Sequence, residues 1–159
     1  MKKLSKTNAV RILEKEKMNF EVMTYDSKDG KIDGISVAQK IGRDEKTVYK
    51  TLVTQGASRE HYVFIIPVAE ELDLKKAAKT VGEKKVEMIH VKDIQKLTGY
   101  IRGGCSPVGM KKRFKTFLDI SSSELEKIIV SGGKIGMQIE IGTGDLLRAV
   151  DGVQADLKK

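Results

Sequence analysis

The sequence has few of the residues that mark secreted and membrane-bound proteins. It contains one cysteine in 159 residues, so no intramolecular disulfide can form, and the sequence fits a reducing compartment. No apolar run approaches the ~20 residues that a helix needs to span a bilayer, and no apolar segment follows the charged N-terminal residues 1–8. We therefore expect neither a membrane span nor a signal peptide, and we expect a cytoplasmic protein.

Metal ligands and nucleotide-binding motifs are equally scarce. The chain has two histidines besides its cysteine, and no two of these three residues have a helical i, i+4 or Cys-x-x-Cys spacing. Gly104 and Gly109 have the spacing of a P-loop, but Met110 stands where that motif needs lysine. The glycines at 142 and 144 are followed by Leu147 where a dinucleotide-binding motif needs glycine. We expect no metal and no ATP or NAD cofactor.

Positive charge is abundant. The chain has 30 Lys and Arg residues against 22 Asp and Glu residues, a net charge of +8 and a pI near 9.5. A polyanionic partner such as a nucleic acid becomes plausible, because cationic side chains bind phosphates by releasing counterions. General solubility is the alternative explanation of the same charge.

The hydrophobic patterns predict helices and strands that alternate without the regular rhythm of a doubly wound sheet. At 159 residues the chain has the usual size of one domain and can bury roughly 70% of its unfolded surface. We predict one α+β domain over residues 1–159, with helices around a mixed β-sheet that curls into a barrel-like form. The expected helices cover 8–17, 37–41, 74–81, 94–97 and 145–150, and the expected strands cover 20–25, 48–54, 61–67, 116–120, 127–130 and 137–141.

One glycine-rich segment, residues 98–113, carries the strongest local signal. Four of the 15 glycines and one of the two prolines lie in it, and it ends in Lys111, Lys112 and Arg113. Glycine admits backbone angles closed to other residues and proline fixes φ, so residues 103–109 should form a tight, stiff loop. Its N–H groups could face an anion or a carbonyl oxygen, with the adjoining cations holding a phosphate chain. A structural turn followed by a solvated basic stretch is the alternative.

Lys50 is unusual because it lies in a predicted strand. In an extended chain its side chain points the same way as those of Val48 and Leu52. If that face is buried, the ammonium group either reaches out to solvent or serves a pocket, where burial would lower its pKa or the cation would act as an electrostatic clamp. The alternative is an edge-strand lysine that discourages sheet-to-sheet pairing.

Other polar side chains have a structural explanation next to a chemical one. Cys105 would need a base to act as a nucleophile, and His90 is the nearest histidine in the chain. Ser106 and Ser131, each near glycine, could position a substrate or satisfy the backbone of a turn. Asp145 fits a cap of the last helix.

Several short motifs, taken in order, resemble the YbaK/EbsC group of aminoacyl-tRNA deacylases, relatives of the editing domain inserted in bacterial prolyl-tRNA synthetase. The resemblance covers nearly the whole chain, and its motifs are specific only in combination. The matching segments are Val48-Tyr49-Lys50-Thr51-Leu52, Pro67-Val68-Ala69, Leu72-Asp73-Leu74-Lys75-Lys76, Lys84-Lys85-Val86-Glu87-Met88, Thr98-Gly99-Tyr100, Gly103-Gly104-Cys105-Ser106-Pro107-Val108-Gly109, Val130-Ser131-Gly132-Gly133-Lys134 and Gly144-Asp145-Leu146.

The resemblance implies a single α+β domain with a curled sheet that hydrolyses the ester of a mischarged tRNA in trans. The family's catalytic lysine falls on Lys50, while Cys105 falls at a variable apolar position, which weakens its case as a nucleophile. The basic stretch after the loop, Lys111, Lys112 and Arg113, supplies the expected tRNA contacts. The implied substrate-binding residues are Tyr49, Thr98, Gly99, Tyr100, Gly103, Gly104, Cys105, Ser106, Pro107, Gly109, Ser131, Gly132 and Asp145.

The implied reaction needs no cofactor, because an aminoacyl ester is already activated and gains most from orientation and oxyanion stabilisation. The resemblance implies removal of cysteine from tRNA for proline, with the substrate's own thiol attacking its carbonyl and leaving as a cyclic thioester. The implied partners are this mischarged tRNA and prolyl-tRNA synthetase, which would present the tRNA to the deacylase. Three alternatives remain: a deacylase of the same fold for alanyl-tRNA for proline, a non-catalytic tRNA-binding module, and a binder of a small anionic metabolite.

Overall fold

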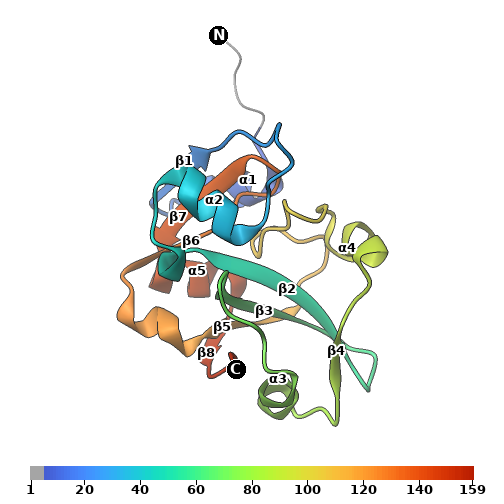
Figure 1. Cartoon of the computed structure of the whole chain (residues 1–159). Helices are drawn as coiled ribbons and strands as arrows, with labels where there is room; N and C mark the ends of the chain where they lie inside the picture. Colours follow the sequence, from blue (N-terminus) through green and yellow to red (C-terminus); the bar gives the residue numbers. More distant parts are fainter. Residues whose placement is uncertain (1–5) are drawn as a thin grey trace.

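The computed structural model describes residues 6–159, in which the strands form two open sheets (Figure 1). The smaller sheet is antiparallel and has the order β1-β7-β6. The larger sheet has the order β4-β2-β3-β5-β8, antiparallel across β4, β2 and β3 and parallel across β3, β5 and β8. The strands are β1 (Phe20–Thr24), β2 (Tyr49–Gly56), β3 (His61–Pro67), β4 (Val86–Met88), β5 (Lys115–Asp119), β6 (Lys127–Ser131), β7 (Met137–Gly142) and β8 (Val153–Ala155).

The mixed α+β class is confirmed, but the barrel-like curl is wrong, because neither sheet closes on itself. Only an isolated bridge between Val48 and Ile129 joins the two sheets. The strands of the smaller sheet pair with one another, and their inner side chains pack against the larger sheet instead of extending its hydrogen-bond ladder. Alternation along a strand predicts its two faces but not its neighbours.

The five α-helices of the described residues lie near the expected places. Asp33 caps α2, since its side chain accepts the Ser36 N–H at 3.1 Å. The expected cap at Asp145 is wrong, because α5 begins at Thr143 and has no side-chain cap. The short strands β4 and β8 are not among the predicted strands. The helices are α1 (Asn8–Lys15), α2 (Gly34–Ile41), α3 (Leu74–Val81), α4 (Val91–Thr98) and α5 (Thr143–Val150), with 3-10 turns at Glu45–Thr47 and Ile120–Glu124.

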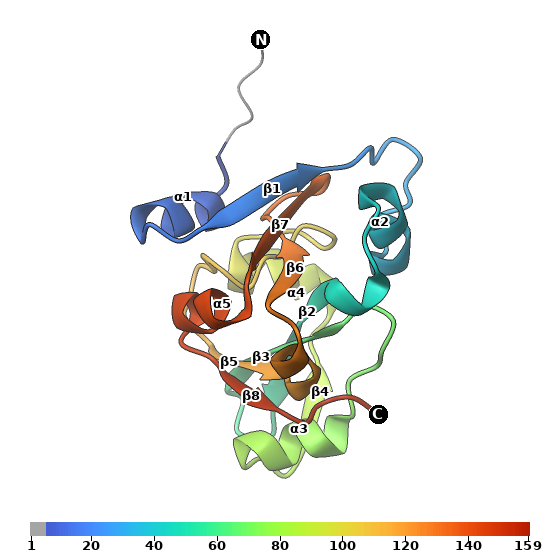
Figure 2. The same cartoon turned by 90° about the vertical axis from the view of Figure 1, so that its left-hand side faces the viewer.

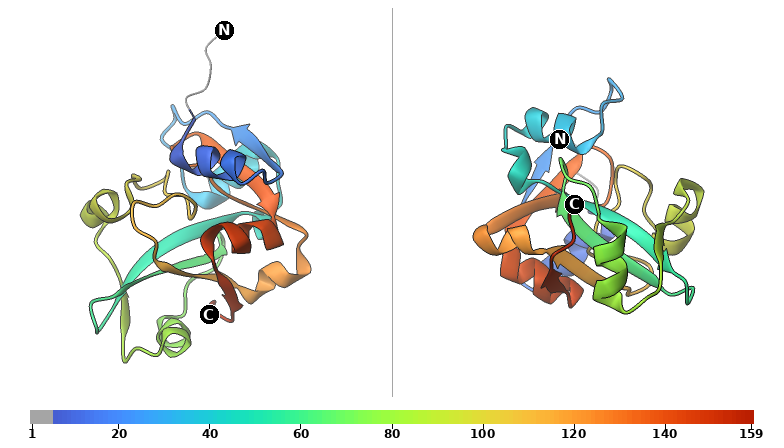
Figure 3. Two further views of the ribbon diagram at one scale, coloured as in Figure 1. Left: turned by 180° about the vertical axis from the view of Figure 1, so that it is seen from behind. Right: turned by 60° about the horizontal axis from the view of Figure 1, so that its bottom comes forward.

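Strand β3 is buried on both faces. Val63 and Ile65 contribute to the main core, which lies between the two sheets and also takes in α1 and α5. Phe64 and Ile66 face a second core formed with α3 and the C-terminal segment. Figure 2 shows the smaller sheet and α1 at one end of the molecule and α3 with β8 at the other. The rear view in Figure 3 shows α3 and α4 on opposite sides of β2.

Within residues 6–159, no helix is long and apolar enough to cross a membrane. Residues 1–5 belong to the N-terminal segment from which we expect no signal peptide, and they lie outside the described residues. The cytoplasmic location and the single domain over 1–159 stay predictions.

Candidate functional site

A small cavity lies between the start of β2, helix α2 and the glycine-rich loop. Its volume is about 130 Å³, which is below the range of about 300–1,000 Å³ usual for ligand pockets. Five of the predicted site residues line it, although they come from three distant parts of the chain: Tyr49, Lys50, Gly103, Cys105 and Ser131. The other lining residues are Ile32, Gly34, Val37, Val48, Thr51, Val68 and Gln138.

Lys50 contributes the one ammonium group of this cavity. It is half-buried in β2, opposite Ile66 of β3, and among the described residues it makes neither an ion pair nor a side-chain hydrogen bond. Burial lowers the pKa of Lys50, and the charges of Glu71 and Glu70 oppose that shift without cancelling it. A cation that has lost water and gained no close partner can still gain energy from an anion or a polarised carbonyl.

Most polar side chains of the glycine-rich loop maintain its shape. The Thr98 hydroxyl accepts the Tyr100 N–H at 3.0 Å, and the Tyr100 hydroxyl donates to the Val108 carbonyl at 2.7 Å. The Ser106 hydroxyl accepts the Val108 N–H at 3.2 Å. Gly99 ends α4 in the left-handed conformation, at φ +83°. None of these predicted substrate-binding residues lines the small cavity, so they position the loop around it.

Gly103 and Gly104 bring the loop against the turn after β6. Gly103 has φ +85°, and a side chain there would begin 2.7 Å from Ile32 Cδ1. A Cβ on Gly104 would lie 2.8 Å from Lys134 Cα and 2.9 Å from the Ile135 nitrogen, both backbone atoms. Only glycine allows this approach, which brings the loop beside the end of β6 that carries Ser131.

The end of the loop belongs to a different cavity. Pro107, Gly109, Lys112 and Arg113 line a space of about 460 Å³ that is also bounded by α1 and α5. The Lys111 N–H donates to the Thr98 carbonyl at 2.8 Å, which ties the basic stretch to the end of α4. The structure therefore places the predicted tRNA-contact residues beside the loop and outside the small cavity.

Two other predicted substrate-binding residues lie away from the small cavity. The Gly132 carbonyl accepts the Thr7 hydroxyl at 2.5 Å. Asp145 lies on α5, where it pairs with Arg148, and it lines a separate cavity near Gly142. Substrate contact by Gly132 and Asp145 stays a prediction that their placement does not favour.

Cys105 is poorly suited to act as a nucleophile. Burial raises the pKa of its thiol to about 11, with a weak opposing effect of the Thr98 hydroxyl 3.9 Å away. The reactive thiolate is therefore scarce at neutral pH. His90, the nearest histidine in the chain, lines another cavity. Cys105 acts here as a wall of the small cavity.

Two polar residues of the small cavity were not singled out from the sequence. Thr51 Oγ1 is buried and has no hydrogen-bonding partner in the part of the chain that the structure describes. Gln138 is buried on β7 directly opposite Ser131 of β6. Thr51 follows the lysine in the motif, and Gln138 is a polar residue in an otherwise buried strand, but neither signal distinguishes a ligand contact from a structural one.

The lining residues therefore supply an ammonium group, hydroxyls and a carboxamide, and Gly103 and Cys105 bring the loop to the cavity. The N–H groups of Gly103 and Cys105 make no hydrogen bond within residues 6–159, whereas the Gly104 N–H donates to the Ile101 carbonyl. No group of three or more His, Cys, Asp or Glu side chains in those residues could hold a metal ion. Such a set of groups suits the binding and polarisation of a small carbonyl compound with an anionic neighbour.

Comparisons with known proteins agree on one family. The model of the aminoacyl-tRNA editing domain matches residues 34–149. A candidate Cys-tRNA(Pro)/Cys-tRNA(Cys) deacylase of Enterococcus faecalis, EbsC, is 45% identical over 152 residues, which are 96% of this chain and 93% of that protein. The multifunctional Ser/Thr-tRNA deacylase ProXp-y of Escherichia coli is 21% identical over 142 residues, 87% of this chain and 84% of that protein.

Solved structures have the same fold. The crystal structure of a candidate trans-editing enzyme for prolyl-tRNA synthetase superimposes with a TM-score of 0.84 at 25% identity, covering 99% of each chain. The match to the family model includes β2, the glycine-rich loop and β6, which together line the small cavity.

The close approach of Gly104 predicts a selective effect of alanine. Gly104→Ala should lower the free energy of unfolding by about 2 kcal/mol, because the new methyl group would overlap the backbone of residues 134 and 135. Gly144→Ala is the matched control, since no atom lies within 4 Å of its Cβ position, and it should change stability by less than about 1 kcal/mol. Urea unfolding of both variants measures the difference, and equal stabilities would contradict the packing of this loop.

Proposed function

The chain belongs to the aminoacyl-tRNA editing domain family and is an aminoacyl-tRNA deacylase; from this premise we propose that it removes cysteine in trans from mischarged tRNA for proline. The observation that carries the proposal is the convergence of Lys50, the glycine-rich loop and Ser131 on one small cavity. The name of its E. faecalis relative supports the choice of cysteinyl ester.

Lys50 holds the anionic or carbonyl part of the substrate in this proposal. The ester joins an amino acid to the terminal ribose of the tRNA. The carbonyl of the ester and the phosphate of the terminal nucleotide are therefore close enough for one site to contact either of them. Gly103 and Cys105 line the cavity and their N–H groups make no hydrogen bond within residues 6–159; in this proposal these N–H groups stabilise the oxyanion that forms on the carbonyl. Thr51 and Gln138 supply further polar atoms for the amino group.

The substrate's own thiol supplies the nucleophile. Its sulfur forms a bond to the carbonyl carbon, the ester C–O bond breaks, and the ribose oxygen leaves with a proton. The product is a cyclic thioester, which water then opens to free cysteine. Cys105 does not compete in this step, because burial raises the pKa of its thiol and keeps it protonated.

The size of the cavity limits selection among small acyl groups. A difference of one or two atoms in an apolar pocket is worth only about 1–3 kcal/mol, so alanyl-tRNA for proline remains the competing substrate. The tRNA itself lies outside the cavity, and we assign its backbone to the basic stretch Lys111, Lys112 and Arg113. Within residues 6–159 none of these three cations forms an ion pair.

The first test compares amino acid release from cysteinyl-, alanyl- and prolyl-tRNA for proline. Wild-type protein should release cysteine fastest, and Lys50→Ala should lose at least about a hundredfold in rate, the cost of removing a transition-state contact of a few kcal/mol. Lys127→Ala is the matched control, because Lys127 is an exposed strand lysine outside the cavity. Full activity of Lys50→Ala would overturn its role.

The other outcomes of the same assay distinguish the alternatives. Faster release of alanine than of cysteine would identify the alanyl ester as the substrate. No release from any ester, with tRNA binding retained, would support a binding module.

A second test replaces the thiol of the substrate by a hydroxyl. Seryl-tRNA for proline should be hydrolysed much more slowly than cysteinyl-tRNA, because a serine hydroxyl is a far weaker nucleophile than a cysteine thiol. Single-turnover rates with the two esters on the same tRNA measure the effect. Equal rates would show that water, and not the substrate's thiol, attacks the ester.

The lowered pKa of Lys50 predicts a dependence on pH. Because the folded protein disfavours the charged form, the cation is lost as pH rises through a pKa below the ordinary value of 10.5. An arginine keeps its charge throughout this range. The activity ratio of Lys50→Arg to wild type, corrected for spontaneous hydrolysis, should therefore rise with pH before pH 10.5 is reached, and a constant ratio would exclude a role for the charge.

A further inference from the structure

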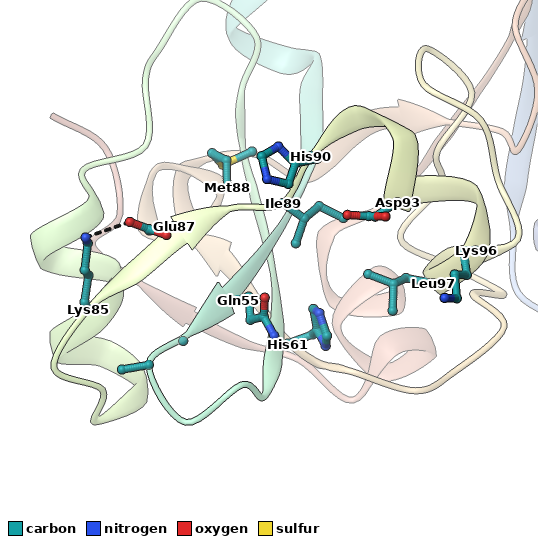
Figure 4. Close-up of a pocket in the computed structure, with 12 residues that line it drawn as sticks. Gln55, His61, Lys85, Glu87, Met88, Ile89, His90, Asp93, Lys96 and Leu97 are labelled. Carbon is teal, nitrogen blue, oxygen red and sulfur yellow. Dashed lines mark ion pairs between the residues drawn. The ribbon is translucent and has the colours of Figure 1, made fainter.

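Figure 4 shows a second cavity, of about 330 Å³. It includes Gln55 and Gly56 at the end of β2, whereas Lys50 lies near the start of that strand. It opens between the β2–β3 hairpin, β4 and α4, and both histidines of the chain, His61 and His90, line it. Gln55 and His61 lie opposite each other in the β2–β3 ladder, and Asp93 and Lys96 come from α4. Nothing in the proposed reaction uses these residues.

We propose that this cavity binds one unpaired nucleotide of the tRNA's 3′ end, upstream of the adenosine that carries the amino acid. The proposal rests on the proposed function, because it takes the same tRNA as its ligand. It assigns a separate site to the part of the RNA that lies outside the reaction cavity.

The side chains of the cavity match the parts of a nucleotide. Neither imidazole ring has a hydrogen-bonding partner among the described residues, and His61 already contacts the ring of Phe114 at 5.7 Å between centroids. Unpaired RNA bases stack on such rings and bond through their free edges. Asp93 offers an acceptor for an exocyclic amino group, and Lys96 offers a cation for a phosphate.

The charges inside the cavity allow an anionic ligand. Of its two carboxylates, Glu87 is paired with Lys85 at 2.7 Å, and that lysine lowers the pKa of Glu87. Lys96 forms no ion pair within residues 6–159. Asp93 is therefore the one carboxylate of the cavity that has no cation already bound to it.

The position of the cavity fits a strand of RNA that starts in the reaction site. Gln55 follows Lys50 by five residues on β2, which at ~3.3 Å per residue is about 17 Å. This distance corresponds to about five stacked nucleotides, or fewer in an extended strand. The alternation of β2 places Gln55 on the same face of the sheet as Thr51, which lines the reaction cavity, whereas the Lys50 side chain points to the other face.

The cavity is also continuous with the proposed tRNA-contact stretch. Phe114, which packs against His61, directly follows Lys111, Lys112 and Arg113 in the chain and lines the neighbouring cavity with two of them. The Lys111 N–H bonds to the end of α4, the helix that carries Lys96. A nucleotide in the cavity therefore lies next to cations that can hold its flanking phosphates.

The experiment measures binding of two RNA hairpins that mimic the acceptor stem and carry no amino acid. One hairpin has an unpaired 3′ tail, and the other has a blunt end. Fluorescence anisotropy at fixed salt gives both affinities. His90→Ala and Lys96→Ala are the test variants, because both residues lie on the surface of α4 or at its start. Lys79→Ala is the control: Lys79 is likewise the basic residue in the last turn of an eight-residue helix, α3, on the other side of β2.

Wild-type protein should bind the tailed hairpin more tightly than the blunt one. His90→Ala and Lys96→Ala should each weaken tailed binding by about tenfold, which is within the range of a lost stacking or phosphate contact, and should leave blunt binding unchanged. Lys79→Ala should match wild type with both RNAs. No loss in either variant, or an equal loss with both hairpins, would overturn the nucleotide site.

Because the RNA in this assay carries no amino acid, the outcome does not depend on catalysis. A protein that cleaves no ester but shows the tail-specific loss would refute the proposed reaction and keep the nucleotide site. A protein that cleaves cysteinyl-tRNA while its variants bind like wild type would keep the reaction and refute the site. In the active enzyme, the variants should raise KM for full tRNA and leave kcat unchanged.

Discussion

The burial of β3 on both faces is the constraint on which the rest of the molecule depends. Val63, Phe64, Ile65 and Ile66 are all fully buried, alternately in the main core and in the core beneath α3. A strand covered on both sides cannot shift its register without exposing apolar side chains. Strand β2 is paired to β3 from Tyr49 to Gln55, so the register that places Lys50 near one end of β2 also places Gln55 near the other.

The polar side chains that line the small cavity have few bonds within the protein. The cysteine of the cavity is kept protonated by burial, its lysine has no close anionic partner, and the Thr51 hydroxyl has no bond within the described residues. Buried polar groups without partners are costly, and a folded protein retains them where a ligand completes their bonds. The glycine-rich loop supplies the shape, because Gly104 allows its backbone to approach the turn after β6 more closely than any side chain would permit.

The ion pairs of the surface and the proposed tRNA-binding cations are different residues. Five of the eight ion pairs in the described residues join two exposed side chains, and exposed pairs contribute little to folding. The cations of 111–113 stand beside the loop without such partners, where their charge is available to a polyanion. The net charge of +8 thus becomes informative only when the cations that form no ion pair within residues 6–159 are located in the structure.

The sequence by itself determined the local elements and the chemistry of the loop. Glycine stops, apolar stripes and alternation depend on neighbours a few residues apart, so α3 and the paired strands β2 and β3 could be predicted closely. Only the tertiary structure decided that the strands form two open sheets, that Gln138 joins Lys50 in one cavity while Asp145 does not, and that His61 and His90 share another. These outcomes depend on contacts between residues far apart in the chain. The packing of whole strands and helices determines those contacts, and no local sequence pattern records it.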